Sequence, residues 1–196
     1  SPLAYANPAR YRDDQLYTVS ALDYYADPLK TTLKDKLGSW DGAIQRVIAP
    51  VVGEVEQDEA GTLQGNWYQT LEIDKNTQED YHIAFVYYNV DPTVPMISIG
   101  RESDLGGAEF KGGESSVTVL QSGYLNRKFS DIVPGHIYGF ELSLDGSLIN
   151  GNDINPSYLL VELLDVTTVK VEIKSGVIPI DSSTWSFSGS AKTFYR

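Results

Sequence analysis

The sequence predicts a mainly β protein that forms a single antiparallel barrel, with a β-sandwich as the alternative. After residue 50, short runs of alternating apolar and polar residues recur between turn residues, which is typical of both folds. Aromatic residues make up 11% of the 196 residues and favour strands. The run Gly65-Asn66-Trp67-Tyr68 follows a turn and opens an alternating segment, with a large ring pointing inward.

The N-terminal part of the chain follows a different pattern, so we expect two parts. Residues 1–50 are predicted to be an arm with short helices packed on the barrel, and residues 51–196 to be the barrel itself. Ser20 and Asp23 resemble a capping box, which predicts a helical turn after Ser20.

Two further helices are expected in the arm. The clearer one has Asp27 as its N-cap and Pro28 in its first turn, and leucines four residues apart (29, 33 and 37) form its apolar stripe. A partner-binding helix would carry such a stripe, but a helix packed against the barrel explains it more simply. Residues 39–48 predict a second short helix that Pro50 ends.

The remaining pattern has the period of two that strands require. Strands are expected at residues 51–55, 61–73, 81–90, 96–100, 116–120, 135–144, 158–164 and 168–174, with one or two more between 185 and 195. Residues 81–90 are apolar on both faces, so this strand is expected to be buried on both sides. Gly65 permits a close backbone approach that a side chain would block.

Composition excludes several classes of function. The formal net charge of -12 would repel a phosphate backbone, so nucleic-acid binding is not expected. The absence of cysteine excludes disulfides and thiol chemistry, and no apolar run is long enough to span a bilayer. A removed export signal would explain the Ser-Pro start, and few basic residues also favour an extracytoplasmic or secreted protein.

The residues around Trp67 resemble known barrels. Gly65-Asn66-Trp67 is similar to the Gly-x-Trp motif of lipocalins, and Gly-Asn-Trp-Tyr is similar to the first strand of avidin-like barrels. In lipocalins this tryptophan closes one barrel end, and an arginine from the end of the last strand stacks on it. The resemblance therefore implies a lipocalin-like barrel with structural roles for Trp67 and Arg196 through a cation–π contact. A long region precedes the motif here, and no second lipocalin motif is found.

A wider resemblance is to a family of bacterial proteins of unknown function. It rests on residues 24–30, 61–68, 82–92, 98–100, 170–172 and 195–196. This likeness implies a shared fold and no particular activity.

Few residues suggest catalysis. The chain has two histidines, of which His82 lies in the most apolar strand and His136 follows a turn. A core histidine and a surface histidine are the simpler interpretations. Glu54, Glu56 and Asp58 alternate along one face and suit acid–base work on a glycoside, although a solvent-facing charged edge also explains them.

One cluster of oxygen-bearing residues suits Ca²⁺, although turn chemistry uses the same residue types. The candidate ligands are Asp145, Asn150, Asn152 and Asp153. Apart from this possible Ca²⁺, no cofactor is expected.

Aromatic residues supply the remaining functional signal, because several strands could direct rings into one cavity. The candidate ligand-binding residues are Tyr68, Tyr81, His82, Tyr87, Tyr88, Tyr138 and Trp185. Rings that only fill the barrel would give the same pattern.

The leading hypothesis is a non-enzymatic binding or structural protein. It would hold a small apolar or sugar-like ligand in the barrel interior, at the end opposite Trp67. The alternatives are a hydrolase or isomerase that uses His82 with a carboxylate, and an interaction module stabilised by Ca²⁺. The sequence does not determine the oligomeric state.

Overall fold

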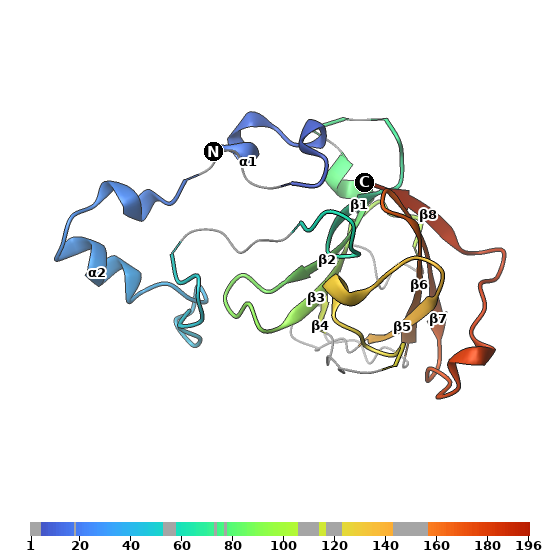
Figure 1. The fold of residues 1–196 in the computed structure, drawn as a ribbon. Helices are drawn as coiled ribbons and strands as arrows, with labels where there is room; N and C mark the ends of the chain where they lie inside the picture. Colours follow the sequence, from blue (N-terminus) through green and yellow to red (C-terminus); the bar gives the residue numbers. More distant parts are fainter. Residues whose placement is uncertain are drawn as a thin grey trace.

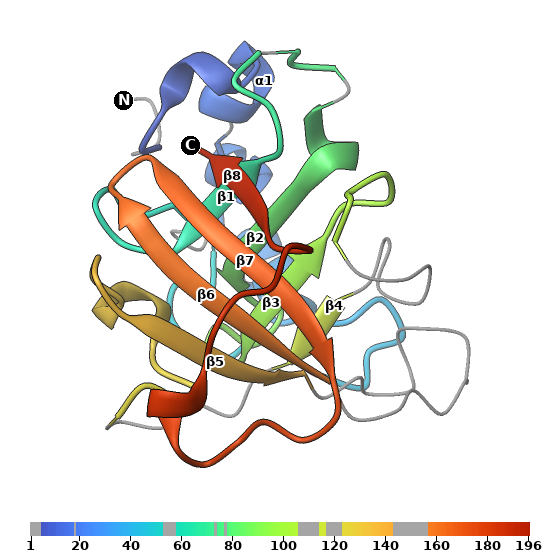
Figure 2. The same ribbon diagram turned by 90° about the vertical axis from the view of Figure 1, so that its right-hand side faces the viewer.

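The computed structural model describes residues 5–17, 19–52, 58–72, 74–76, 78–105, 114–116, 123–142 and 157–196. Among these residues, eight strands form one antiparallel sheet in the order β4-β3-β2-β1-β8-β7-β6-β5. The sheet curls so that β1–β4 face β5–β8, with β4 and β5 as its two edges (Figure 1, Figure 2). The predicted mainly β, barrel-like fold is therefore confirmed.

The strands are β1 (Gly65–Tyr68), β2 (His82–Tyr87), β3 (Pro95–Ile99), β4 (Glu114–Ser116), β5 (Ile137–Leu142), β6 (Ser157–Asp165), β7 (Thr168–Ser175) and β8 (Lys192–Tyr195). Every helix in the described ranges is short. They are the 3-10 helices η1 (Pro8–Arg10), η2 (Ala21–Tyr24), η3 (Gln78–Tyr81), η5 (Phe129–Asp131) and η6 (Ser182–Thr184), and the α-helices α1 (Asp13–Leu16) and α2 (Leu29–Lys34).

The predicted hairpin near the C-terminus is confirmed as β6 and β7. Alternation along β7 places Val169 and Val171 in the core with no exposed surface, and Ile173 packs against the same core. The neighbouring strand β8 pairs Phe194 with Val169. This alternation is what a half-buried antiparallel strand requires, because successive side chains point to opposite faces.

The concave side of the sheet is filled by apolar side chains from both walls. Phe129, carried by η5, lies between the walls, with its ring 5.5 Å from that of Phe85 on β2 and 5.4 Å from that of Phe140 on β5. All three rings are fully buried. Side chains from β1, β3, β6, β7 and β8 complete this core. The two walls therefore hold together by apolar packing across the interior.

Part of the outer face is covered as well. Trp185 lies in the connection between β7 and β8, where its indole nitrogen donates to the Pro179 carbonyl oxygen at 2.9 Å. The indole packs with Leu160 and Ile178 over Gly139, where a Cβ would collide with both covering side chains. The prediction that Trp185 lies in a strand is wrong, because Trp185 is the C-cap residue of η6.

The arm differs from the prediction in one helix. The expected helix over residues 39–48 is wrong, because Gly38 and Gln45 form an antiparallel bridge around a turn. Ser39 Oγ accepts from the Ile44 amide at 2.9 Å and donates to the Asp41 carboxylate at 2.6 Å. A serine and aspartate that bond within a turn compete with helix formation, which explains the difference.

The other arm predictions fare better. Ser20 Oγ accepts from the Leu22 amide at 3.2 Å, which confirms a capped helical turn at η2. The helix predicted after Asp27 is confirmed as α2, where Asp27 accepts from the Thr31 amide at 3.3 Å. It ends at Lys34, one turn short of the expected stop, and none of its residues is buried.

Four predicted strands lie partly outside the described residues, namely 51–55, 61–73, 116–120 and 135–144. Residues 51–52 are not in a strand.

Gly65 confirms the expected close approach at the start of β1. A Cβ at this position would collide with Asp58 Oδ1 and lie 2.9 Å from Arg196 Nη2. Its φ of +128° also lies in the region that favours glycine. Two independent constraints therefore require glycine here.

We expect Gly65→Ala to destabilise the fold by about 3 kcal/mol, since both backbone strain and a collision in a buried site oppose it. Urea unfolding followed by tryptophan fluorescence measures this loss. Gly189→Ala is the matched control, because a Cβ at Gly189 meets no atom within 4 Å and its φ is ordinary. Equal effects of the two substitutions would contradict the argument.

Candidate functional site

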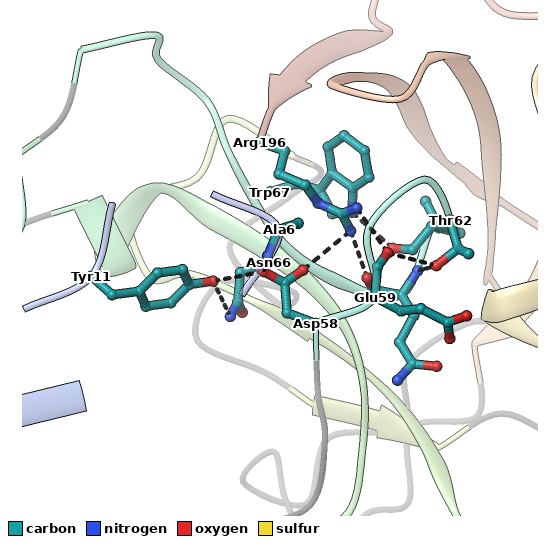
Figure 3. Close-up of polar contacts among 10 residues, drawn as sticks. Ala6, Tyr11, Asp58, Glu59, Thr62, Asn66, Trp67 and Arg196 are labelled. Atoms are coloured by element: carbon teal, nitrogen blue, oxygen red, sulfur yellow. Dashed lines mark hydrogen bonds and ion pairs between the residues drawn. The ribbon is translucent and has the colours of Figure 1, made fainter. Parts of the chain in front are cut away.

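Arg196 lies over Trp67 at one end of the barrel. The guanidinium carbon is 4.2 Å from the centroid of the indole, which is fully buried (Figure 3). This is the contact that the lipocalin resemblance implies. Arg196 also donates to the carbonyl oxygens of Glu59 at 3.1 Å and Gln64 at 2.5 Å. The residue that follows β8 is therefore joined to the turn that precedes β1, so cation–π attraction and hydrogen bonds act on the same guanidinium.

Asp58 provides the negative charge opposite Arg196. Its Oδ1 lies 3.4 Å from Arg196 Nη2, and both side chains are almost fully buried. The interpretation of Asp58 as part of a solvent-facing charged edge is therefore wrong. Because Gly65 has no side chain, the backbone of β1 leaves room for this pair. Glu54 and Glu56, which were grouped with Asp58, lie outside the described residues.

The N-terminal arm is attached to the same carboxylate. The Ala6 amide donates to Asp58 Oδ2 at 2.8 Å, and the Tyr11 hydroxyl donates to that oxygen at 3.5 Å (Figure 3). The Tyr11 hydroxyl accepts from Asn66 Nδ2 at 3.1 Å. We call Tyr11, Asp58, Trp67 and Arg196 the latch, because these four side chains join the arm, β1 and β8.

A second contact of the arm lies beside the latch. Arg10 is buried and stacks over Tyr68 at 4.7 Å from the ring centroid. It donates to the Thr70 carbonyl oxygen at 3.0 Å, and Gln78 on η3 accepts from Arg10 at 3.5 Å. The first part of the arm is thus fixed to the barrel end by buried polar groups with defined partners.

Burial changes the acid–base behaviour of the latch. It raises the pKa of Asp58 above its usual value of 3.8, because loss of hydration outweighs the attraction of Arg196. Burial also raises the pKa of the Tyr11 hydroxyl far above its usual value, with smaller contributions from Tyr68 and Asp58. Tyr11 therefore remains a hydrogen-bond donor at all physiological pH values.

A groove of about 310 Å³ lies on the outer face of β1, β2 and β3. The pairing of these strands explains it, because Asn66, Ala84 and Ser98 are cross-strand neighbours in one row. The methyl group of Ala84 leaves a hollow between the two longer polar side chains. The full lining is Asn66, His82, Ala84, Val86, Tyr87, Tyr88, Asn89, Met96 and Ser98.

The groove combines rings, apolar side chains and polar groups. The lining residues, all within the described part of the chain, include no Asp, Glu, Lys or Arg. Asn66 belongs to both the groove and the latch, because its amide donates to Tyr11. The arm therefore holds one polar group of the groove in place.

The predicted ligand-binding residues do not gather in one cavity. His82, Tyr87 and Tyr88 border the groove. Tyr68 is buried under Arg10, Tyr138 is buried in the core, and Trp185 is on the outer face of β5 and β6. Tyr81 is 40% exposed at the end of η3. Rings at strand positions thus fall on opposite faces of the curled sheet.

The expected ligand position in the interior is occupied by protein side chains. Beyond Trp67 the interior holds the rings of Phe85, Phe129 and Phe140, with Tyr87 6.0 Å from Phe129. The outer groove, by contrast, was not predicted. The sequence does contain a signal for this groove, namely one polar residue within each of three apolar strands (residues 66, 82 and 98). Only the pairing of the strands brings these positions together.

The other candidate residues are either exposed or outside the part of the chain that the structure describes. His136 is exposed, and its ring centroid lies 5.0 Å from that of Tyr124. The predicted Ca²⁺ ligands Asp145, Asn150, Asn152 and Asp153 lie outside the described residues. Among the residues that the structure describes, no three His, Asp or Glu side chains are placed to hold a metal ion.

These features define a class of protein: a mainly β half-barrel with a filled interior, an arm latched to one end and a groove on the outer face. No protein-family model, no curated protein and no solved structure matched this chain in the comparisons. In the described ranges, no helix is long and apolar enough to cross a membrane.

The latch generates a prediction about coupled charges. Removing one partner of a buried ion pair leaves the other without compensation and costs about 3–5 kcal/mol. We therefore expect Arg196→Met to lower the free energy of unfolding strongly, because it leaves the Asp58 carboxylate buried without compensation. Asp58→Asn should cost less, because burial already disfavours the charge of Asp58, and the double variant should lose less than the sum. Denaturant unfolding of all four proteins gives the coupling energy. Additive losses would contradict a coupled pair.

Asp58 also generates a prediction about pH. A carboxyl group with a raised pKa in the folded state takes up its proton there first, so protonation stabilises the fold. As the pH falls from neutral through the folded pKa of Asp58, its contribution to the free energy of unfolding should become more favourable. The wild type should therefore gain stability relative to Asp58→Asn over this range. A difference that stays constant with pH would show that Asp58 titrates normally.

Proposed function

We propose that this protein is a non-enzymatic binding protein whose ligand site is the outer groove on β1–β3. The observation that carries the proposal is the lining itself, which combines Tyr88, Val86 and Met96 with a row of Asn66, Ala84 and Ser98 on neighbouring strands. Small-ligand sites combine apolar walls with a few placed polar groups, and their volumes begin at about 300 Å³. The groove fits this description at the small end.

The chemistry of the lining favours a small uncharged ligand with one apolar face and several hydroxyl groups, such as a neutral sugar. No charged side chain lines the groove to pair with an ionic ligand. The net charge of -12 would also repel anions. Amide and hydroxyl side chains can orient sugar hydroxyls, and an aromatic ring can cover the apolar face of a sugar ring.

The enzymatic alternative has less support at this groove. A hydrolase or isomerase that uses His82 needs a carboxylate within hydrogen-bond reach. His82 borders the groove, but the lining includes no Asp or Glu. Binding without turnover is therefore the function that the groove supports best.

We expect a panel of neutral mono- and disaccharides to include ligands that give saturation-transfer NMR signals with the wild type. Tyr88→Ala should weaken binding about tenfold, which corresponds to the loss of about 1.4 kcal/mol of contact energy. Ala84→Leu should abolish binding, because the larger side chain fills the hollow between Asn66 and Ser98. Denaturant unfolding of each variant checks that the fold is retained.

Tyr17→Ala is the control, since Tyr17 is 61% exposed and does not line the groove. It should bind as the wild type does. The proposal fails if no neutral sugar binds, or if binding is insensitive to Tyr88 and Ala84. Turnover of a bound substrate that His82→Ala abolishes would instead favour the enzymatic alternative.

A further inference from the structure

The groove and the N-terminal arm meet at the side chain of Asn66. Successive residues of β1 alternate between the two faces of the sheet, so Trp67 lies in the core and Asn66 lies on the outer face. There Asn66 lines the groove, in one row with Ala84 and Ser98. It is half-buried, and its Nδ2 donates to the Tyr11 hydroxyl at 3.1 Å (Figure 3). One end of this side-chain amide is therefore committed to the arm.

Tyr11 is a fixed partner for that amide. Tyr11 is buried, and its ring stacks on that of Tyr5, with the ring centroids 3.9 Å apart and the ring planes at 28°. Its hydroxyl is held from another direction by Asp58 Oδ2 at 3.5 Å. A buried ring in close contact with its neighbours has little room to change rotamer. The Tyr11 hydroxyl therefore meets Asn66 at a defined position.

The hydrogen bonds of the Tyr11 hydroxyl have a defined direction. A hydroxyl has one proton to donate, and a carboxylate can only accept. Tyr11 donates its proton to Asp58, whose Oδ2 also accepts from the Ala6 amide at 2.8 Å. The Tyr68 hydroxyl also hydrogen-bonds to Tyr11, and it can adapt because it can donate or accept. Tyr11 thus offers Asn66 a lone pair, which the amide nitrogen can use and the amide oxygen cannot.

The other end of the Asn66 amide is left for the groove. Oδ1 and Nδ2 branch from the same carbon of one planar group, so holding Nδ2 on the arm also determines where Oδ1 lies. Among the residues that the structure describes, none donates a hydrogen bond to Asn66 Oδ1. The neighbouring side chain of Ala84 is a methyl group and has no proton to offer. Asn66 Oδ1 is thus an unused acceptor, and a ligand that pairs with it must supply a proton.

We propose that Tyr11 is a positioning residue for the groove, which holds the Asn66 amide so that Oδ1 selects ligands that donate a proton, such as the hydroxyl of a neutral sugar. This inference rests on the proposed binding function of the groove and adds the basis of its selectivity. The two ends of an amide have opposite hydrogen-bonding character. Without the Tyr11 hydroxyl, the amide can turn and present either end, so ligands with and without the donor bind alike.

Side-chain amide signals in NMR spectra of the ligand-free protein test the positioning by itself. A proton on Asn66 Nδ2 should exchange with water about tenfold more slowly than those of Asn76, which is exposed, because a hydrogen bond must open before exchange. Tyr11→Phe removes the hydroxyl and keeps the ring, so it should abolish this difference. Equal exchange at Asn66 and Asn76 in the wild type would overturn the proposal, and this comparison depends on no variant.

Fluorinated sugars test the selectivity. The probes are the methyl glycosides of glucose, galactose and mannose, each compared by NMR titration with derivatives in which fluorine, which cannot donate a proton, replaces one hydroxyl. At one position of a sugar that binds, the replacement should weaken binding to the wild type about fivefold, which is typical of one hydrogen bond. In Tyr11→Phe and in Asn66→Ala, the same replacement should change the affinity less than about twofold. Adding Tyr11→Phe to Asn66→Ala should have no further effect on binding.

Tyr17→Phe is the matched control, because Tyr17 is a 61% exposed tyrosine of the same arm and does not line the groove. It should keep the selectivity of the wild type. Selectivity that survives Tyr11→Phe would overturn the proposal. An equal loss of affinity for every sugar, repeated in the Asn66→Ala background, would also overturn it, because Tyr11 would then only support the fold. If no sugar binds the wild type, the proposed function fails and the selectivity with it, whereas the exchange measurement still shows whether Tyr11 fixes Asn66.

Discussion

The buried contact between Asp58 and Arg196 over the Trp67 ring is the interaction on which the rest of the structure depends. One guanidinium closes the last strand against the first, and one carboxylate fixes the N-terminal arm to the same point. Gly65 is the condition for this contact, since any side chain there would occupy the space of the pair. Fixing these groups together at one end lets the opposite wall of the sheet curl over a shared core.

Burial makes this contact expensive as well as specific. Both charges lose hydration, and the raised pKa of Asp58 shows that Arg196 only partly offsets that loss for the carboxylate. Apolar packing of the two walls, with Phe129 between Phe85 and Phe140, provides the favourable free energy. The ion pair then determines that β8 meets β1 and where the arm attaches to the barrel. Its contribution is to geometry more than to the free energy of folding.

The same curvature determines where binding is possible. Because phenylalanine rings fill the concave side of the sheet, only the polar and aromatic residues on its outer face are available to bind a ligand. On β1–β3 these residues surround the small Ala84 and form the groove. Asn66 links that groove to Tyr11 of the arm, so the groove is connected to the latch.

Local sequence determined much of this protein. Alternation predicted the β6–β7 hairpin, Ser20 predicted the cap of η2, and Gly65 predicted a close approach, because each depends on neighbouring residues or on backbone conformation alone. Only the tertiary structure decided that Asp58 is buried and that the predicted aromatic residues separate to opposite faces. Those outcomes depend on contacts between residues far apart in the chain, as in the pairing of Asp58 with Arg196, which no local pattern specifies.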